Sequence, residues 1–486
     1  MERISTDKGE IILKKRNPNV INLADLAFGD SHKGSATDAI VRHEEASAVV
    51  RYNGGCQAGH EVMTSDGKQH IFAQFGSGML VPGVKTHLSR FMLIDPLAMM
   101  REEKYLREVG VDDAFDRTTI DEDAIIVTPF HRAANRIREI VRGKNRHGSC
   151  GRGVGEAYAD SLSDSKNMVL RAKDLTGNSY KISRKLAFIQ GAKYAQVADI
   201  IEDCPEKAKI AKEIRTFTSV DAREIASRYR YFERIAKIVD AGYLTSLLQE
   251  GTVVFEGAQG VLLDPCLSFP PHTTCGNTTF ANATTLLKEN SYQGKITNIG
   301  LIRGYCTRHG PGPFPTEFSL ISTMLNHEHN TTNEWQGPFR IGWLDIVLLK
   351  YSIEVCGGID CLSVSHLDQL SSLSEWKAAS SYVIRSGKYF REMAGFKSED
   401  FFDCSMHGLA QRIKLAPNSG EQTKRQEFLT KLFMDNYLSP QYDRFTDMAT
   451  YLHYIEKNLG APIAITSYGP TAKDKKFLPV WEKMTK

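Results

Sequence analysis

The feature that most constrains the fold is a buried strand near the start of the chain that runs through a glycine-rich loop into a helix. Residues 20–27 (VINLADLA) are apolar enough for a buried strand, and residues 36–43 continue as a helix. The loop between them reads GDSHKG over 29–34. Such a loop directs backbone N–H groups and the positive end of a helix dipole toward whatever lies above it. The segment therefore predicts an α/β unit whose loop faces a ligand.

The same succession of an apolar strand and a glycine-rich or polar loop recurs along the chain. Further strands are predicted at 48–52, 124–127, 252–255, 296–302, 361–364 and 463–466. In open α/β sheets, ligands bind at the carboxyl ends of the strands. Residues 96–145 and 190–250 are predicted to be helical subregions, and the pattern over 370–450 does not indicate how that segment is organised. We expect a loose extension over 1–18 and one large domain over 19–486.

Composition narrows the class of protein. The chain has 486 residues, 41% of them hydrophobic, and a formal net charge of only +3, which does not indicate a general nucleic-acid-binding surface. Its nine cysteines include no CxxC pair, so a reduced protein is expected. The start is too polar for a secretory signal, and no run approaches the roughly 20 apolar residues of a membrane span. We therefore expect a cytoplasmic protein without a membrane or nucleic-acid partner.

Two glycine-rich loops hold residues that could carry chemistry. In the first, Asp30 has the properties of a general base or magnesium ligand, and Lys33 could meet phosphate oxygens. In the second loop, residues 53–60, His60 could polarise a phosphate oxygen. Taken singly, each has an ordinary structural explanation, since an aspartate in a turn is more often a helix cap. The Walker A spacing is absent, which argues against a P-loop kinase.

The order of motifs along the chain is more specific than any one of them. From about residue 20 to residue 470 the chain resembles the adenylosuccinate synthetase family, most specifically in FEGAQGVLLD and GPGPFPTE. The motifs, in order, are GDSHKG, YNGGCQAGH, GSCGRGVG, FEGAQGVLLD, NTT, YCTRHGPGPFPTE, GWLD, SHLD and SYGP. The resemblance implies an α/β fold with a large, mostly parallel central sheet flanked by helices and related to P-loop NTPases. It also implies a homodimer.

The resemblance assigns the catalytic roles to residues of the first two loops. Asp30 matches the family's catalytic base and magnesium contact, and Gly59 would offer its carbonyl to the same Mg²⁺. His60 matches the general acid on the transferring phosphate, and Lys33 matches the loop lysine near the phosphates.

The resemblance also assigns two groups of nucleotide-binding residues. Those expected to hold the acceptor purine nucleotide are Gln57, Cys150, Arg171, Gln259, Thr274 and His309. Those expected beside the base of the triphosphate, GTP or ATP, are His366, Asp368, Ser467, Gly469 and Pro470.

Three departures from the family pattern bear on specificity. His32 stands where the family has glycine, and SHLD (365–368) replaces the guanine-reading TKxD, which leaves GTP or ATP open. The arginine-rich loop that reads the carboxylates of aspartate retains one arginine, Arg340. Thr331 and Thr332 could partly replace the lost threonines. Because bidentate arginine is the usual carboxylate partner, the amine donor is either aspartate held differently or another amine.

These features favour a ligase that uses a nucleoside triphosphate and Mg²⁺ to join aspartate to IMP. The same chemistry on GMP or dGMP, or with another amine, is an alternative. A non-catalytic nucleotide sensor is the alternative from another class. A binder would not need both a base and an acid, so the retention of Asp30 and His60 favours the enzyme.

Overall fold

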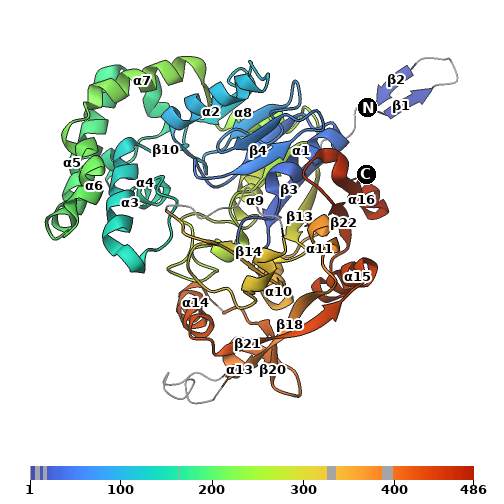
Figure 1. The fold of residues 1–486 in the computed structure, drawn as a ribbon. Helices are drawn as coiled ribbons and strands as arrows, with labels where there is room; N and C mark the ends of the chain where they lie inside the picture. The colour runs from blue at the N-terminus through green and yellow to red at the C-terminus, as the bar shows by residue number, and fades with distance from the viewer. Residues whose placement is uncertain are drawn as a thin grey trace.

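The centre of the molecule is a ten-stranded sheet (Figure 1). The computed structural model describes residues 2–5, 11–14, 19–163, 165–325, 335–385, 398–416 and 418–485. Across the sheet the strands are β11 (Lys237–Val239), β9 (Thr118–Asp121), β7 (Lys85–Leu88), β4 (Ala48–Arg51), β12 (Val253–Glu256), β3 (Asn19–Asp25), β13 (Lys295–Arg303), β17 (Cys361–Ser365), β22 (Ile463–Ser467) and β23 (Lys475–Phe477). Every neighbouring pair is parallel except β22 and β23. The predicted mostly parallel sheet is confirmed.

Most predicted strands lie in this sheet. Six of them correspond within two residues to β3, β4, β12, β13, β17 and β22. The segment at 124–127 instead forms β10 (Ile125–Ile126), which pairs with β8 (Leu93–Ile94) in a separate small sheet. The pattern missed β7 and β9, whose sequences KTHL and TTID are short and polar. They are nevertheless mostly buried because they lie between other strands of the sheet.

Helices cover both faces of the sheet because the central strands are apolar on both sides. Ile21 and Leu23 of β3 pack with α1 (Lys33–Glu44) and α16 (Pro479–Thr485) on one face. Val20, on the opposite side of the same strand, packs with α8 (Gly242–Leu247) and α9 (Ala281–Glu289). This alternation follows the two-residue period of a strand.

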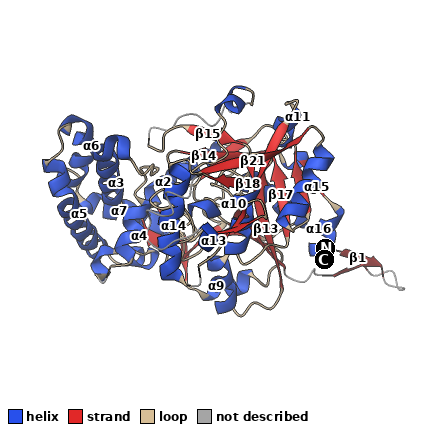
Figure 2. Ribbon diagram, turned by 90° about the horizontal axis from the view of Figure 1, so that it is seen from below, coloured by secondary structure: helices blue, strands red, loops and turns tan. Residues whose placement is uncertain are grey.

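A helical arm extends from one end of the sheet (Figures 1 and 2). It consists of α3 (Pro129–Arg142), α4 (Val154–Ser161), α5 (Ser179–Glu202), α6 (Lys207–Thr218) and α7 (Ala222–Ile235), with α2 (Pro96–Glu108) at its base. A buried lysine, Lys193, joins α5 to α4 through Glu156 (2.9 Å) and Asp160 (2.8 Å).

Within the part of the chain that the structure describes, no helix is both long and apolar enough to cross a membrane.

The segment that the sequence pattern left undefined forms a second, smaller sheet. Its strands are β16 (Leu344–Asp345), β18 (Trp376–Ile384), β19 (Phe402–Cys404), β20 (Leu409–Ile413) and β21 (Leu438–Phe445). The helices around it are α10 (Ile346–Val355), α13 (Ser398–Phe401), α14 (Ser419–Met434) and α15 (Met448–Leu459). One apolar cluster runs from this sheet to β13 and β17, so the two sheets share a core.

The remaining elements are short. Three antiparallel hairpins pair β1 (Glu2–Ser5) with β2 (Ile11–Lys14), β5 (His60–Met63) with β6 (Gln69–Phe72), and β14 (Cys306–His309) with β15 (Phe339–Gly342). A short helix, α11 (Leu367–Ser371), follows β17. Since the central strands are parallel, the loops that follow β3, β4, β12, β13, β17 and β22 all lie at one edge of the sheet.

Candidate active site

A cleft of about 360 Å³ opens at this edge, between the loops that follow β3, β13, β17 and β22. From the predicted set it is lined by Asp30, Lys33, Gly59, His60, His366, Asp368, Ser467, Gly469 and Pro470. All the residues predicted for catalysis and for the base of the triphosphate therefore meet in one cavity. Arg303 and Gln369 also line it and were not predicted. The position of Arg303 directly after the apolar strand 296–302 is the signal that could have identified it.

Asp25 organises the first loop. It lies at the end of β3 and accepts hydrogen bonds from the backbone N–H groups of Ala27 (2.9 Å) and Ser31 (2.7 Å). Its carboxylate also pairs with Lys33 Nζ at 2.9 Å, and the same ammonium donates to the carbonyl of Gly29. The lysine predicted to meet phosphates is thus buried beneath the loop while still lining the cleft.

His32 adopts a backbone conformation that favours glycine. Its φ is +49°, in the left-handed region, and its ring Nε2 lies 2.9 Å from Ser363 Oγ. Burial and the charges of Lys475, Arg303 and Lys33 hold the pKa of His32 well below its usual range, so the ring is neutral. The side chain does not cap α1, which leaves the first N–H groups of that helix available to an anion.

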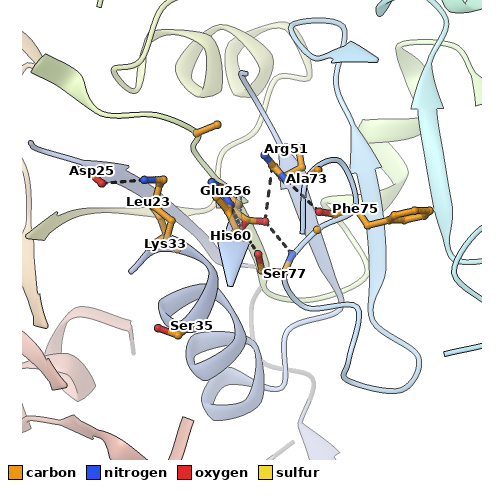
Figure 3. Close-up of polar contacts among 12 residues, drawn as sticks. Leu23, Asp25, Lys33, Ser35, Arg51, His60, Ala73, Phe75, Ser77 and Glu256 are labelled. Carbon is orange, nitrogen blue, oxygen red and sulfur yellow. Dashed lines mark hydrogen bonds and ion pairs between the residues drawn. The ribbon is translucent and has the colours of Figure 1, made fainter. Parts of the chain in front are cut away.

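His60 is fixed by a buried carboxylate (Figure 3). Its Nδ1 lies 2.6 Å from Glu256 Oε1, at the end of β12. Glu256 also accepts a hydrogen bond from Ser77 N–H (3.0 Å) and lies 3.9 Å from Arg51 Nε. Because Nδ1 faces the carboxylate, Nε2 is the nitrogen left for a ligand. Burial and the charge of Arg51 lower the pKa of His60 to about 4, although Glu256 acts in the opposite direction.

Asp30 is held from outside its own loop. Its Oδ2 forms an ion pair with His309 Nε2 at 3.1 Å, and its backbone carbonyl accepts a hydrogen bond from Arg303. Burial raises the pKa of Asp30, but His309, Arg303 and Lys33 outweigh this effect and bring it below the usual range. Burial lowers the pKa of His309, but Asp30 raises it further, so the net shift is upward. Asp30 and His309 therefore shift each other's pKa in the direction that favours their charged forms.

Two of the predicted acceptor residues lie where neighbouring loops pack against each other. A Cβ on Gly54 would lie 2.5 Å from the Ala258 side chain and 3.4 Å from the amide of Gln259, so only glycine fits this approach. Gln57 Oε1 is buried and has no hydrogen-bond partner among the described residues. An orphaned buried acceptor of this kind is a candidate ligand contact.

The other acceptor residues are more dispersed. Thr274 N–H donates to the carbonyl of Leu263 (2.7 Å), and burial raises the pKa of the Cys150 thiol. Arg171 donates to the carbonyl of Asp123 (2.6 Å), and its N–H bonds to the carboxylate of Asp174. Among the described residues that line the cleft, none belongs to the six predicted for the acceptor.

The retained arginine of the amine-donor loop is already engaged. Arg340 Nε donates to Glu317 Oε1 (3.0 Å), and Nη2 donates to the second oxygen of that carboxylate. Its Nη1 donates to the carbonyls of Gly310 (3.1 Å) and Gly312 (2.9 Å). Thr331 and Thr332 lie outside the described residues.

Lys475 holds the loop that is predicted to lie beside the triphosphate base. Its Nζ donates to the carbonyls of Gly469 and Pro470, each at 3.0 Å. Burial lowers the pKa of Lys475 to about 8. His366, which also lines the cleft, has a φ of +57°, and its Nδ1 lies 2.9 Å from Ser365 Oγ. It directly precedes α11, the helix that contains Asp368.

The residues predicted to hold Mg²⁺ fit that ion. The cleft presents the carboxylate of Asp30 and the backbone of Gly59, and Asp30 Oδ2, although 3.1 Å from His309 Nε2, accepts no hydrogen bond from the described residues. Mg²⁺ prefers oxygen ligands and is often held by one or two carboxylates together with substrate phosphates. No group of three or more metal-binding side chains occurs in the described ranges.

Comparisons with known proteins identify a family for the chain. The adenylosuccinate synthetase family model matches residues 23–410. The adenylosuccinate synthetase of Clostridium beijerinckii is 30% identical over 79% of this chain and 83% of its own length. That of Chlorobium chlorochromatii is 28% identical over 96% and 98%, respectively.

Two solved structures share the fold. Fully ligated adenylosuccinate synthetase from Plasmodium falciparum superposes with a TM-score of 0.71 at 22% identity, covering 95% of this chain and 100% of that one. Cyanophage S-2L succinoaminodeoxyadenylate synthetase, bound to dGMP and dATP, gives a TM-score of 0.55 at 14% identity, covering 96% and 100%.

Proposed function

The chain belongs to the adenylosuccinate synthetase family, a family of C–N ligases, and we propose that it joins aspartate to the 6-position of IMP at the expense of a nucleoside triphosphate. The observation that carries this proposal is the meeting of a carboxylate base and a histidine in one cleft. Asp30 lies on the loop after β3, and His60, fixed by Glu256, is the first residue of β5. A protein that only sensed nucleotides would not need both.

In the first step Asp30 removes the proton from N1 of the 6-oxopurine. The electron pair moves to O6, which forms a bond to the γ-phosphorus while the bond to the β-phosphate oxygen breaks. His60, oriented by Glu256, faces the transferring phosphate with Nε2 and donates a proton or hydrogen bond to its oxygen. The approach of that anion raises the pKa of His60 from about 4.

In the second step the amine attacks C6, and the O6 atom departs as part of inorganic phosphate. Lys33 and the first turn of α1 supply positive charge beside the phosphates throughout. Mg²⁺, when bound, supplies additional charge neutralisation at the phosphates, and Asp30 and Gly59 are the residues that would hold it.

The triphosphate is proposed to be GTP, with ATP as the alternative. The Asp368 carboxylate lines the cleft and can accept hydrogen bonds from guanine N1–H and the 2-amino group, which adenine does not offer in that arrangement. His366 offers an imidazole where the family has a lysine.

GMP or dGMP is the alternative acceptor. An amine other than aspartate is the alternative donor. The structural neighbour from cyanophage S-2L was solved with dGMP, although at 14% identity it supports the fold alone. The engagement of Arg340 with Glu317 supports a donor that is held without that arginine.

We also propose that the protein is cytoplasmic and forms a homodimer. Light scattering of the purified protein would test the homodimer.

Phosphate release by the purified protein with Mg²⁺ tests the proposal. Each of IMP, GMP and dGMP is paired with aspartate and with a panel of other amines, under GTP and under ATP. Turnover with IMP and aspartate is the expected result, and turnover with another pairing alone would identify the changed specificity. No release in any pairing would favour the nucleotide-sensing alternative.

A further inference from the structure

Asp30 is held from two directions, by the last residue of β13 and by the last residue of β14. Its backbone carbonyl accepts a hydrogen bond from Arg303 at the end of β13. Its Oδ2 lies 3.1 Å from Nε2 of His309 at the end of β14. Asp30 lines the cleft, and the side chains of Asp30 and His309 are 27% and 25% exposed, so neither is sealed from solvent.

The backbone beneath His309 is firmly anchored. Arg308, only 2% exposed, donates hydrogen bonds of 3.0 to 3.2 Å to the carbonyls of His272, Pro311 and Pro313. β14 pairs with β15 so that His309 lies opposite Phe339, and their ring centroids are 4.9 Å apart. The imidazole is therefore set by the strand pair rather than by Asp30.

The contact with His309 is what selects an orientation for the carboxylate. Asp30 Oδ2 is buried and has no other polar partner among the described residues, and Nδ1 of His309 is likewise unpartnered there. The terminal torsion of an aspartate is broad, so the side chain alone does not choose a direction. A ring nitrogen held 3.1 Å away supplies the preference.

We propose that His309 is a positioning residue for the base: its anchored imidazole holds the Asp30 carboxylate in the orientation from which it takes the purine proton. The inference rests on the proposed function, in which Asp30 is the base. It gives His309 a role other than the contact with the acceptor nucleotide that the sequence predicts. A residue that acts in this way affects the rate of the chemical step more than the binding of substrate.

Two variants of the full-length chain test the proposal kinetically, with the substrate pairing on which the natural protein turns over. His309→Val removes the N–H group, and His309→Gln places an amide N–H at a similar reach. We expect H309V to lower kcat by about 10- to 100-fold, the scale of a misplaced catalytic group. KM for the acceptor should stay within about twofold, and H309Q should recover most of kcat. An unchanged kcat in H309V, or a loss confined to KM, would overturn the proposal.

Crystal structures of the two variants give a measurement that does not depend on turnover. Asp30 Oδ2 should keep its position in H309Q and turn away in H309V, while thermal melting confirms that both variants fold. An unmoved carboxylate in H309V would overturn the proposal even in an active enzyme. If the natural protein turned over no pairing, the proposed function would fail, and the orientation of Asp30 in the crystals would still decide whether His309 holds it.

Discussion

The two groups of predicted site residues, which we call the triphosphate side and the acceptor and donor side, differ in how their side chains are engaged. On the triphosphate side, the residues predicted from the sequence line one cavity, and the polar contacts around them hold loops in place. Lys475 donates a hydrogen bond to the carbonyl of Gly469, and Asp25 accepts one from the backbone of the loop that contains Asp30. On the acceptor and donor side, the guanidinium groups of Arg171 and Arg340 donate hydrogen bonds to other residues of the chain.

This difference separates the chemistry from the choice of substrate. Phosphoryl transfer to a 6-oxo group needs a base, an acid and positive charge whatever the acceptor and the amine, and Asp30, His60 and Lys33 match the family motifs for these roles. Specificity depends on contacts that can be rebuilt while the reaction stays the same. We therefore expect substitutions on the triphosphate side to have the larger effects on turnover.

The largest effect is expected from Asp30→Asn. The amide cannot take the purine proton, so kcat should fall by about 10²- to 10⁴-fold, the usual contribution of a general base. Steady-state phosphate release measures the loss. Asp66→Asn, at an exposed turn, is the matched control and should leave kcat unchanged. Near-normal turnover in D30N would remove Asp30 from the role of base.

A smaller loss is expected from His60→Ala. Removing one donor to the charge that develops on the phosphate should cost about 2–4 kcal/mol of transition-state stabilisation, measured from kcat/KM. His70→Ala is the matched control because His70 is buried on the same hairpin and lies 3.9 Å from Glu102 rather than in the cleft. If both variants lost the same activity, the effect would belong to the hairpin and not to His60.

Asp368→Ala should change which triphosphate is used. Hydrogen bonds to a charged group contribute about 1.5–3 kcal/mol, so the preference for GTP over ATP should fall by about 10- to 100-fold. The ratio of kcat/KM for the two triphosphates measures it, with Gln369→Ala as a control on the same wall. An unaltered ratio would show that another group reads the base.

The smallest effect is expected from Arg340→Ala. Because its guanidinium is paired with the partly exposed Glu317, its loss should lower the free energy of unfolding by only about 1 kcal/mol, with KM for the amine changed less than threefold. Arg412→Ala breaks a similar bidentate pair with Glu354 and is the control for stability. A KM raised more than tenfold in R340A alone would return Arg340 to the donor site and contradict the contrast between the two sides.

Much of the fold and of the triphosphate side follows from local sequence. Apolar runs such as 20–27 and 361–364 predict buried strands. The loops that follow these strands lie at one edge of the sheet because the strands are parallel. The same reasoning could have found Arg303 at the end of its strand. It could not find β7, whose polar sequence is buried only because β4 and β9 enclose it.

Which side chains pair across the site was decided only by the tertiary structure. His60 meets Glu256 across 196 positions of sequence, and Arg303 meets the carbonyl of Asp30 across 273. Likewise, His309 meets Asp30 and Arg340 meets Glu317 only because strand pairing brings their loops together. Local sequence sets the residue types and the strand ends, whereas an ion pair depends on distances of a few ångström that only the packed sheet and its loops establish.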